Sequence, residues 1–568
     1  MKKKIFIIVL IFFINAFIVN ANSMKLLAVS QDVNGTYQGS VADLEIEIRE
    51  GNGKVFIDTY PYSKIDTQIS SRFAKEIACD FLDTDCNKLD FFYTITAGSY
   101  IIGGPSGSSA IAALTIITLD NLNYDRNVAI TGSINSGGFI GSVSGIKEKI
   151  EAAAKQKITK VLIPIGTKNQ TQQNNISIDL IKYGADLGIK VVEVADINEV
   201  IFEFTDKKYP ELTNIKVEES YKNTMKTLAQ DLCGKSKILR KKILDTDIKK
   251  IRETKINLTI AEEANNMTNK GLGEIEKNNF YSAASFCFGA NVKFSEIIFE
   301  LNNESDLNKL KTEIEEFESS IDLRGYKTIT DLQAYMVVKE RLKEAKEIVN
   351  LAYKNQKENK TFIKEFAYAN ERLHSAKSWS KFLNNKGKEF HFDPDVLRAS
   401  CSDKIAEAEE RWQYLNLFLP NSDHVRKDLD KAKVDQSVEN YELCLFRASK
   451  SKAQINSILN FIGVKDVKQL IDNKFSVIEK NIAKKIDKNI FPIVGYSYFE
   501  YAKSLSEEED YYSSILYGEY ALELSDIEIY FKPKKDQRKI EIPENSLYLT
   551  IGLIIGFFIG LFIKKRKK

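Results

Sequence analysis

Ser106 and Lys149 are the residues of this 568-residue sequence whose types and surroundings best suit bond-breaking chemistry. Ser106 follows Gly104-Pro105 and precedes Gly107, directly before an apolar helical segment. Glycines let a backbone approach a substrate carbonyl closely, and the free N–H groups at a helix N-terminus suit an oxyanion. The pattern predicts a serine nucleophile with an oxyanion hole around Gly104 and Gly107. The alternative is that this serine is only an N-cap, the ordinary role of a serine before a helix.

Lys149 is the candidate base. Ile146, Lys149, Ile150 and Ala153 share the spacing of one helix face, which places the lysine on the apolar stripe of that helix. A base must be neutral, so the pKa of this amine has to fall by about 3 from about 10.4, and burial can lower the pKa of an amine that far. The alternative is a lysine that reaches solvent from the edge of the stripe.

Histidine chemistry is excluded from the segment that holds both residues. The sequence has three histidines, and none lies between residues 24 and 206. A Ser-His-Asp triad or a Cys-His pair within that segment is therefore ruled out by composition. The His-Glu-x-x-His and Cys-x-x-Cys patterns of metal sites are also missing from the sequence, so we expect neither a metal nor another cofactor.

The chain that positions Ser106 and Lys149 has two regions with different residue patterns. Residues 24–206 alternate strand-like runs with helix-like segments, which predicts an α/β or α+β domain. Past Pro210 glycine becomes sparse, and helical spacing predicts an all-helical array over residues 211–540. Three of its segments resemble one another faintly, but their irregular spacing favours a general antiparallel array over a true repeat.

Both ends of the chain carry apolar segments. Residues 1–21 have the lysines, apolar run and small residues of a signal peptide, with an uncleaved N-terminal helix as the alternative. Residues 546–563 lack charge and precede the basic tail 564–568, which predicts a single C-terminal transmembrane helix with a cytoplasmic tail. We therefore expect a single-pass protein of the cell membrane, with the bulk of the chain outside the cytoplasm.

Charge and short motifs bear on the partners. Once the basic ends are set aside the chain is mildly acidic, which argues against binding to nucleic acid. Gly552, Gly556 and Gly560 have the spacing of a helix-packing motif, which allows a homo-oligomer, although glycine is common in membrane helices. A formal P-loop pattern at residues 229–236 follows a helical segment rather than a strand, so we do not expect ATP binding.

The six cysteines suit disulfides in an oxidising compartment. Pairing of sequence neighbours would join Cys79 to Cys86, and only this pairing carries weight because six cysteines allow many connectivities. The corresponding pairings for the other four would be Cys233 with Cys287 and Cys401 with Cys444.

Four ordered motifs resemble the proteolytic domain of Lon proteases. They are Gly104-Pro105-Ser106, VAITGSI at 128–134, GIKEKIEAA at 145–153 and VLIP at 161–164. The blocks align without a gap, and the interval of 43 residues between Ser106 and Lys149 matches the family's catalytic dyad. The resemblance covers roughly residues 24–206.

The resemblance implies a serine endopeptidase that hydrolyses polypeptide substrates. Ser106 would be its nucleophile, Lys149 its base, and Thr131 would orient the lysine. Ser133 looks like the archaeal-type variant of the family. Gly103 and Gly107 depart from the family's usual residues around the serine, as does Ser144 from its usual Gly-Gly before the lysine helix.

The family's ATPase is not recognisable in this sequence, so we expect an enzyme that works without ATP. The alternative is a non-catalytic surface scaffold or binding protein, in which the helical region binds partners.

Overall fold

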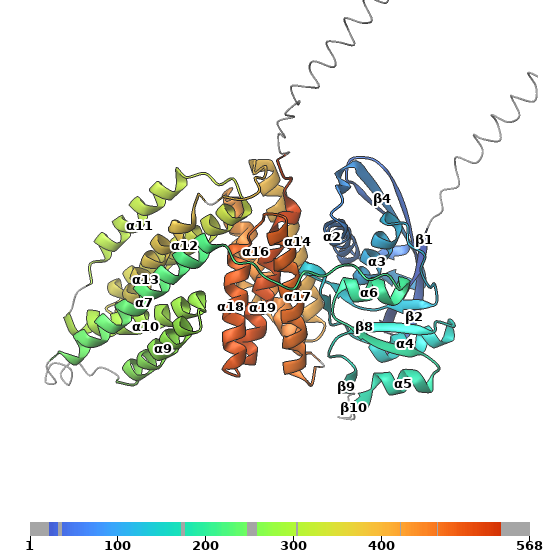
Figure 1. The fold of residues 1–568 in the computed structure, drawn as a ribbon, viewed down its shortest axis with the longest axis horizontal. Helices are drawn as coiled ribbons and strands as arrows, with labels where there is room; N and C mark the ends of the chain where they lie inside the picture. Colours follow the sequence, from blue (N-terminus) through green and yellow to red (C-terminus); the bar gives the residue numbers. More distant parts are fainter. Residues whose placement is uncertain are drawn as a thin grey trace, which may run out of the picture. The chain divides into compact units, whose positions relative to one another are not determined.

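The computed structural model describes residues 22–31, 37–171, 177–246, 258–302, 305–384, 386–420, 422–462 and 464–534. The described residues up to Lys532 belong to one compact unit. Figure 1 shows a mixed α/β part at the start of the described chain, followed by helices. The predicted order of an α/β domain and a helical array is thus confirmed, while the limits 24–206 and 211–540 stay a prediction.

A mixed seven-stranded sheet forms the α/β part, with strand order β11-β8-β5-β1-β2-β4-β3. β1 pairs antiparallel with β2 and parallel with β5. Neighbouring residues of a strand face opposite sides of the sheet, so Leu26 and Leu27 of β1 enter separate cores. The bounds are β1 Asn22–Gln31, β2 Tyr37–Glu50, β3 Val55–Ser63, β4 Leu89–Ile102, β5 Val128–Ile130, β8 Lys160–Pro164 and β11 Lys190–Val194.

Helices cover both faces of this sheet. Residues of α2, α3 and α6 enter the core that contains Leu26, whereas residues of α4 and α5 enter the core that contains Leu27. Two short ribbons, β6 with β7 and β9 with β10, complete this part. The bounds are α2 Ile65–Leu82, α3 Ser108–Leu119, β6 Ser133–Ile134, β7 Ile140–Gly141, α4 Ile146–Lys155, β9 Asn169–Thr171, β10 Ser177–Asp179, α5 Leu180–Asp186 and α6 Ile197–Thr205.

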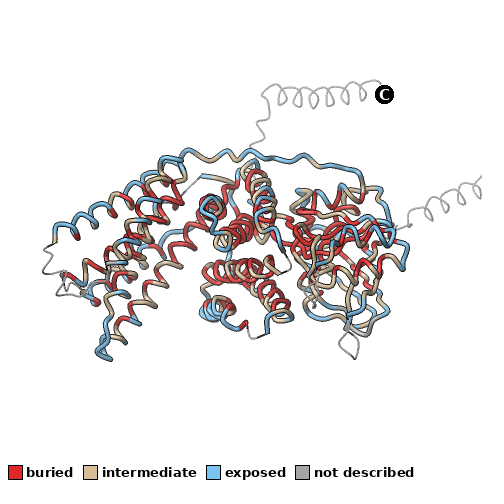
Figure 2. The backbone as a smooth tube through the Cα atoms, turned by 90° about the horizontal axis from the view of Figure 1, so that it is seen from below, coloured by how far each residue is buried: buried red, intermediate tan, exposed pale blue. Residues whose placement is uncertain are grey.

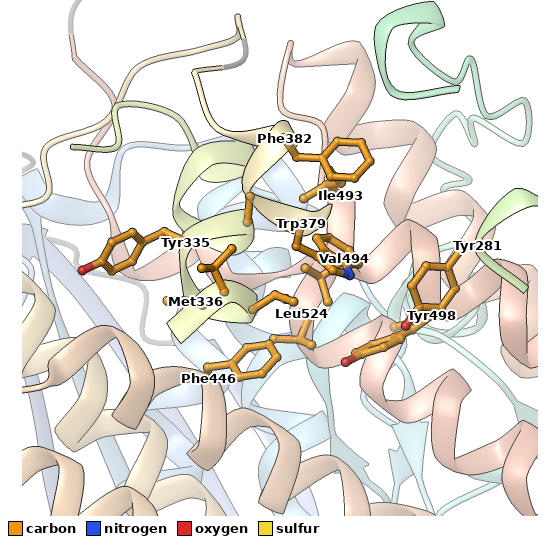
Figure 3. Close-up of a cluster of buried hydrophobic side chains, with 14 of the residues drawn as sticks. Tyr281, Tyr335, Met336, Trp379, Phe382, Phe446, Ile493, Val494, Tyr498 and Leu524 are labelled. Atoms are coloured by element: carbon orange, nitrogen blue, oxygen red, sulfur yellow. The ribbon is translucent and has the colours of Figure 1, made fainter. Parts of the chain in front are cut away.

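Long helices make up the rest of the described chain. Buried residues concentrate on the faces that these helices turn toward one another (Figure 2). Aromatic and aliphatic side chains from several helices meet in the cluster drawn in Figure 3. The bounds are α7 Glu219–Leu244, α9 Leu258–Glu276, α10 Phe280–Asn302, α11 Leu307–Asp322, α12 Ile329–Lys357, α13 Ile363–Trp379, α14 Pro394–Asn416, α15 Lys427–Ser437, α16 Tyr441–Phe461, α17 Val467–Asp487, α18 Ile493–Glu507 and α19 Tyr511–Ser525.

Three disulfides staple the structure. Cys79–Cys86 lies at the end of α2. The other two join helices, α7 to α10 through Cys233–Cys287 and α14 to α16 through Cys401–Cys444. In each disulfide a cysteine is bonded to the next cysteine along the sequence.

The predicted fold class needs a correction at the membrane anchor. Among the described residues, the structure has no helix that combines the length and apolar character needed to cross a membrane. The predicted anchor 546–563, its glycines, the tail 564–568 and the signal peptide 1–21 lie outside the described residues. The fold class is therefore corrected to a mixed α/β domain followed by a helical array, and the localisation as a single-pass membrane protein is not supported.

The formal P-loop pattern at 229–236 lies inside the continuous helix α7. Its Cys233 is bonded to Cys287, and the hydroxyl of Ser236 donates a hydrogen bond to the side-chain oxygen of Asn291 at 2.7 Å. A P-loop needs a glycine-rich turn between a strand and a helix, so this segment lacks the form that cradles phosphates.

Candidate active site

The predicted nucleophile Ser106 lies in a short 3₁₀ turn, Pro105–Gly107, between β4 and α3. Gly104 opens this turn at φ +97°, a conformation that favours glycine. The N–H of Gly104 donates to Asp66 Oδ2 at 3.0 Å, so it is engaged by the start of α2. Of the two glycines predicted around an oxyanion hole, Gly107 stands at the N-cap position of α3, where backbone N–H groups begin to point outward.

A cavity of about 60 Å³ adjoins Ser106. Leu26, Ala42 and Ile95 give it apolar walls, and Thr67 and Ser70 add hydroxyl-bearing side chains from α2. Helix α2, with these lining residues and Asp66, was not predicted from the sequence. The repeated burial of Phe73, Ala74, Ile77 and Ala78 in α2 follows helical spacing, a signal that was readable in the sequence.

Lys149 is buried in α4, with 2% of its surface exposed. Its stripe neighbours Ile146 and Ile150 pack in the core beneath the sheet, which removes water from the amine. The ammonium nitrogen Nζ donates to Thr131 Oγ1 at 3.0 Å, and Thr131 is itself fully buried. Burial lowers the pKa of Lys149 to about 7, and the nearby charge of Glu148 opposes that fall. The lysine is thus poised to exchange a proton near neutral pH.

The serine turn and the lysine helix converge at the C-terminal end of β5, although they begin on opposite faces of the sheet. The N–H of Gly132 donates to the carbonyl of Ser106 at 3.1 Å, and the hydroxyl of Ser109 donates to the carbonyl of Gly132 at 2.7 Å. The adjacent Thr131 accepts the bond from Lys149. Two consecutive residues therefore hold the backbone of the candidate nucleophile and the amine of the candidate base.

The side chains of Ser106 and Lys149 do not contact one another through a hydrogen bond in the described structure. Ser106 lines the small cavity, whereas Lys149 is bonded to Thr131 and does not line it. Hydrogen bonds of catalytic groups are often long in an enzyme without substrate and tighten when substrate binds. The structure therefore brings both residues to the same strand end without forming the dyad bond.

Gly145 begins the lysine helix at φ +64°. A Cβ atom added there would lie 2.6 Å from Val29 Cγ2 of β1, so both the backbone conformation and the packing require glycine. The departure of Ser144 from the family's Gly-Gly therefore leaves the essential glycine in place.

Helices from the distant array brace the segment between Thr131 and Lys149. The N–H of Ser144 donates to the hydroxyl of Tyr414 at 2.9 Å, and Arg411 Nη2 donates to the carbonyl of Ile134 at 3.1 Å. The N–H of Gly137 donates to Asp526 Oδ2 at 2.9 Å. These contacts fix the loop that leads into α4.

Sequence reasoning missed all three bracing residues. Their sequence separations from their partners exceed 260 residues, and no local pattern marks a side chain for such a contact.

Comparisons with known proteins match the segment of the chain that holds this candidate site. Residues 66–204 match the Lon protease (S16) C-terminal proteolytic domain. A Lon protease of Endomicrobium trichonymphae is 30% identical over 130 residues, 23% of this chain and 15% of the relative. One of Methanosphaera stadtmanae is 30% identical over 164 residues, 28% of this chain and 19% of the relative. An archaeal Lon protease of Archaeoglobus fulgidus is 34% identical over 100 residues, 18% of this chain and 15% of the relative.

The resemblance inferred from the four motifs is thereby confirmed. The matched part of the chain is similar to the proteolytic domain of Lon proteases. The chain spans less than a fifth of the length of each of these three relatives, and the family match ends at residue 204, before the helical array.

Proposed function

We propose that this protein is a serine endopeptidase that uses Ser106 as nucleophile and Lys149 as general base. The observation that carries the proposal is the burial of the Lys149 amine, with its hydrogen bond and its lowered pKa. Its amine is fully buried, its hydrogen bond goes to the Thr131 hydroxyl, and burial lowers its pKa to about 7. A lysine needs this environment to be neutral and to accept a proton under ordinary conditions.

The proposed reaction has two halves. Ser106 Oγ attacks the carbonyl carbon of the scissile peptide bond while its proton passes to neutral Lys149. The lysine then gives this proton to the leaving amine, the C–N bond breaks, and an acyl-enzyme ester remains on Ser106. Water attacks the ester, its proton passes through the same lysine to Ser106 Oγ, and the carboxylate product leaves.

The remaining predicted residues have supporting roles in this proposal. Thr131 holds the amine of Lys149 at the strand end, and the N–H of Gly107 receives the oxyanion. The N–H groups of Ser108 and Ser109 are engaged by the carbonyls of Pro105 and Gly132. Gly104 contributes through its backbone conformation, since its N–H is engaged by Asp66. We propose that flexible polypeptides are hydrolysed without ATP; the formal P-loop pattern at 229–236 is helical and is given no role.

The direct test compares cleavage of casein by the full chain and by its Ser106→Ala and Lys149→Met variants. We expect both variants to lose activity, while Lys147→Met retains it. Lys147 is the matched control because it lies on the same helix with its side chain 26% exposed and 3.5 Å from Glu151. Full activity in either dyad variant would contradict the proposal.

The pH dependence offers a second test. Because the pKa of Lys149 is lowered to about 7, its neutral form is depleted below pH 7 and predominates above it. We expect kcat/KM for casein or a peptide substrate to rise with pH through about 7 and then to level off. A rate that is independent of pH between 5 and 9 would argue against Lys149 as the base.

A further inference from the structure

A partly open cavity of about 210 Å³ lies within the helical array, far in sequence from the candidate active site. Side chains from seven helices form its walls, namely α7, α10, α12, α13, α16, α18 and α19. The disulfide Cys233–Cys287 joins α7 to α10 next to the lining residues Leu232 and Phe288. The cavity is therefore a preformed feature of the array rather than a gap between mobile segments.

Aromatic side chains dominate the lining. Tyr281, Trp379 and Tyr498 lie close together (Figure 3), with ring centroids 6.1 Å apart for Tyr281 and Trp379 and 5.9 Å apart for Tyr281 and Tyr498. Tyr501 and Tyr517 add a further pair with centroids 4.7 Å apart. Burial raises the pKa of both tyrosines, so their hydroxyls keep their protons as hydrogen-bond donors.

Positive charge exceeds negative charge around these rings. Arg341, Arg372 and Lys450 line the cavity, against a single carboxylate, Glu340. Lys450 is paired with Glu340 at 3.0 Å, and Arg372 is paired with Glu344 at 2.7 Å. Two of the three cations are thus already matched by carboxylates.

Arg341 is the third of these cations, and no ion pair with a carboxylate is seen for it among the described residues. Its Nε is buried and has no hydrogen-bond partner among the described residues. Its guanidinium carbon lies 5.9 Å from the ring centroid of Trp379, which holds the group beside the aromatic wall. A buried donor without a partner is costly, and a planar guanidinium matches the two oxygens of a carboxylate.

We propose that this cavity binds a small aromatic carboxylate, with the carboxylate on Arg341 and the aromatic ring among Tyr281, Trp379 and Tyr498. The volume suits one aromatic residue rather than a larger ligand, because typical drug-sized sites measure roughly 300–1,000 Å³. The same chemistry is offered by a free aromatic acid and by the C-terminal residue of a peptide. The proposal is independent of the peptidase reaction.

Isothermal titration calorimetry on the full chain tests this site with two matched probes, N-acetylphenylalanine and its uncharged amide. We expect the acid to bind at least about 10-fold more tightly than the amide, because a hydrogen bond to a charged group contributes roughly 1.5–3 kcal/mol. A peptide that ends in phenylalanine, as free acid or as amide, forms the second arm. Tighter binding of the peptide acid than of the free acid identifies a chain terminus as the source, and the reverse order identifies a small molecule.

Arg341→Gln should weaken binding of the acid at least about 10-fold, and Arg341→Lys should weaken it less. Arg398→Gln is the matched control, since Arg398 is an exposed residue of α14 whose side chain is 60% exposed. Far-ultraviolet circular dichroism and thermal unfolding establish that each variant is folded, and Tyr517→Phe, which keeps the ring, provides a milder variant. Equal binding of acid and amide, unchanged affinity in Arg341→Gln, or no binding of either acid at millimolar concentration would overturn the proposal.

Discussion

Buried lysines in the two halves of the molecule have opposite electrostatic surroundings. Lys149 in the α/β part has a hydroxyl as its hydrogen-bond partner, and burial lowers its pKa to about 7. Lys404 in the helical array is equally buried but is 2.9 Å from Glu407 and 3.1 Å from Glu523. Burial by itself would lower the pKa of Lys404, but the two carboxylates outweigh it and hold the pKa above its ordinary value.

The difference shows that burial alone does not make a base. Two carboxylates keep the buried Lys404 charged, whereas the neutral partner of Lys149 leaves the cost of burial uncompensated. Lys485 of the array behaves like Lys404: burial by itself would lower its pKa, but Asp526 and Asp80, the latter from α2, outweigh burial and hold the pKa above its ordinary value. We therefore interpret Lys404 and Lys485 as structural and Lys149 as reactive.

Removal of Lys149 should have the largest effect on activity. Loss of a general base typically lowers a rate by about 10²–10⁴-fold, so we expect Lys149→Met to reduce kcat by that amount. Lys404→Met should leave kcat of the folded protein within a few-fold of the wild type. Steady-state cleavage of casein measures both, and a similar loss in the two variants would erase the distinction between them.

Lys149→Met should also stabilise the fold below pH 10.5. The folded-state pKa of Lys149 is depressed, so its contribution to stability is fully present above about 10.5 and is lost as pH falls to about 7. Over that window the wild type should lose roughly 4–5 kcal/mol relative to Lys149→Met. Urea unfolding of both proteins at several pH values measures this difference, and a constant difference across the window would show that Lys149 is not desolvated.

Lys404→Met should destabilise the array. The substitution leaves Glu407 and Glu523 buried with less positive charge, and breaking a buried ion pair costs about 3–5 kcal/mol. The lower end applies here, because Lys452 still pairs with both carboxylates. A matched double variant, Lys404→Met with Glu523→Gln, should recover part of the loss in thermal unfolding. No recovery would indicate that packing rather than charge dominates.

Thr131→Val should have a smaller effect on catalysis. The substitution keeps the shape but removes the acceptor at 3.0 Å from Lys149 Nζ, so the charged form of the amine loses a hydrogen bond. We expect about a 10-fold fall in kcat/KM, in line with roughly 1.5 kcal/mol for such a bond, and a shift of the pH profile toward lower pH. Thr131→Ser, which keeps the hydroxyl, should restore most of the activity.

Tyr414→Phe tests the brace from the array and should have the smallest effect. The hydroxyl accepts the N–H of Ser144, next to the glycine that begins the lysine helix. Its loss should lower kcat/KM about 3–5-fold, equivalent to roughly 1 kcal/mol. Tyr496→Phe is a suitable control, because Tyr496 packs on Tyr221 and Phe491 in the array instead. Equal effects of the two variants would argue against a brace.

Much of this architecture was predictable because its signals are local. The spacing of Ile146, Lys149 and Ile150 predicted α4 and the buried face of the lysine, and the structure places Lys149 in the core. Strand β5 ends at Ile130; the N–H of the next residue, Thr131, still donates to the carbonyl of Leu162 in β8 at 3.0 Å, while its hydroxyl accepts from Lys149. Helix α2 was missed, although its apolar spacing was present, and the bracing contacts of Tyr414 and Asp526 had no local signal at all.

The membrane anchor teaches a different lesson. It was inferred from an uncharged run that precedes a basic tail, and no membrane-crossing helix occurs in the part of the chain that the structure describes. A run of uncharged residues is weaker support than an ordered set of motifs, because apolar composition is shared by segments with many different fates.

The sequence by itself determined which residues could do chemistry here. The absence of histidine between residues 24 and 206 excluded histidine-based catalysis in that segment. The order and spacing of four motifs then selected Ser106, Thr131 and Lys149. Only the tertiary structure decided the pKa of Lys149 and its hydrogen-bond partner. The pKa of Lys149 depends on how completely the surrounding core excludes water, and its partner depends on where β5 ends. Desolvation and hydrogen bonding arise from contacts between distant segments, so they follow from the fold and not from any local pattern.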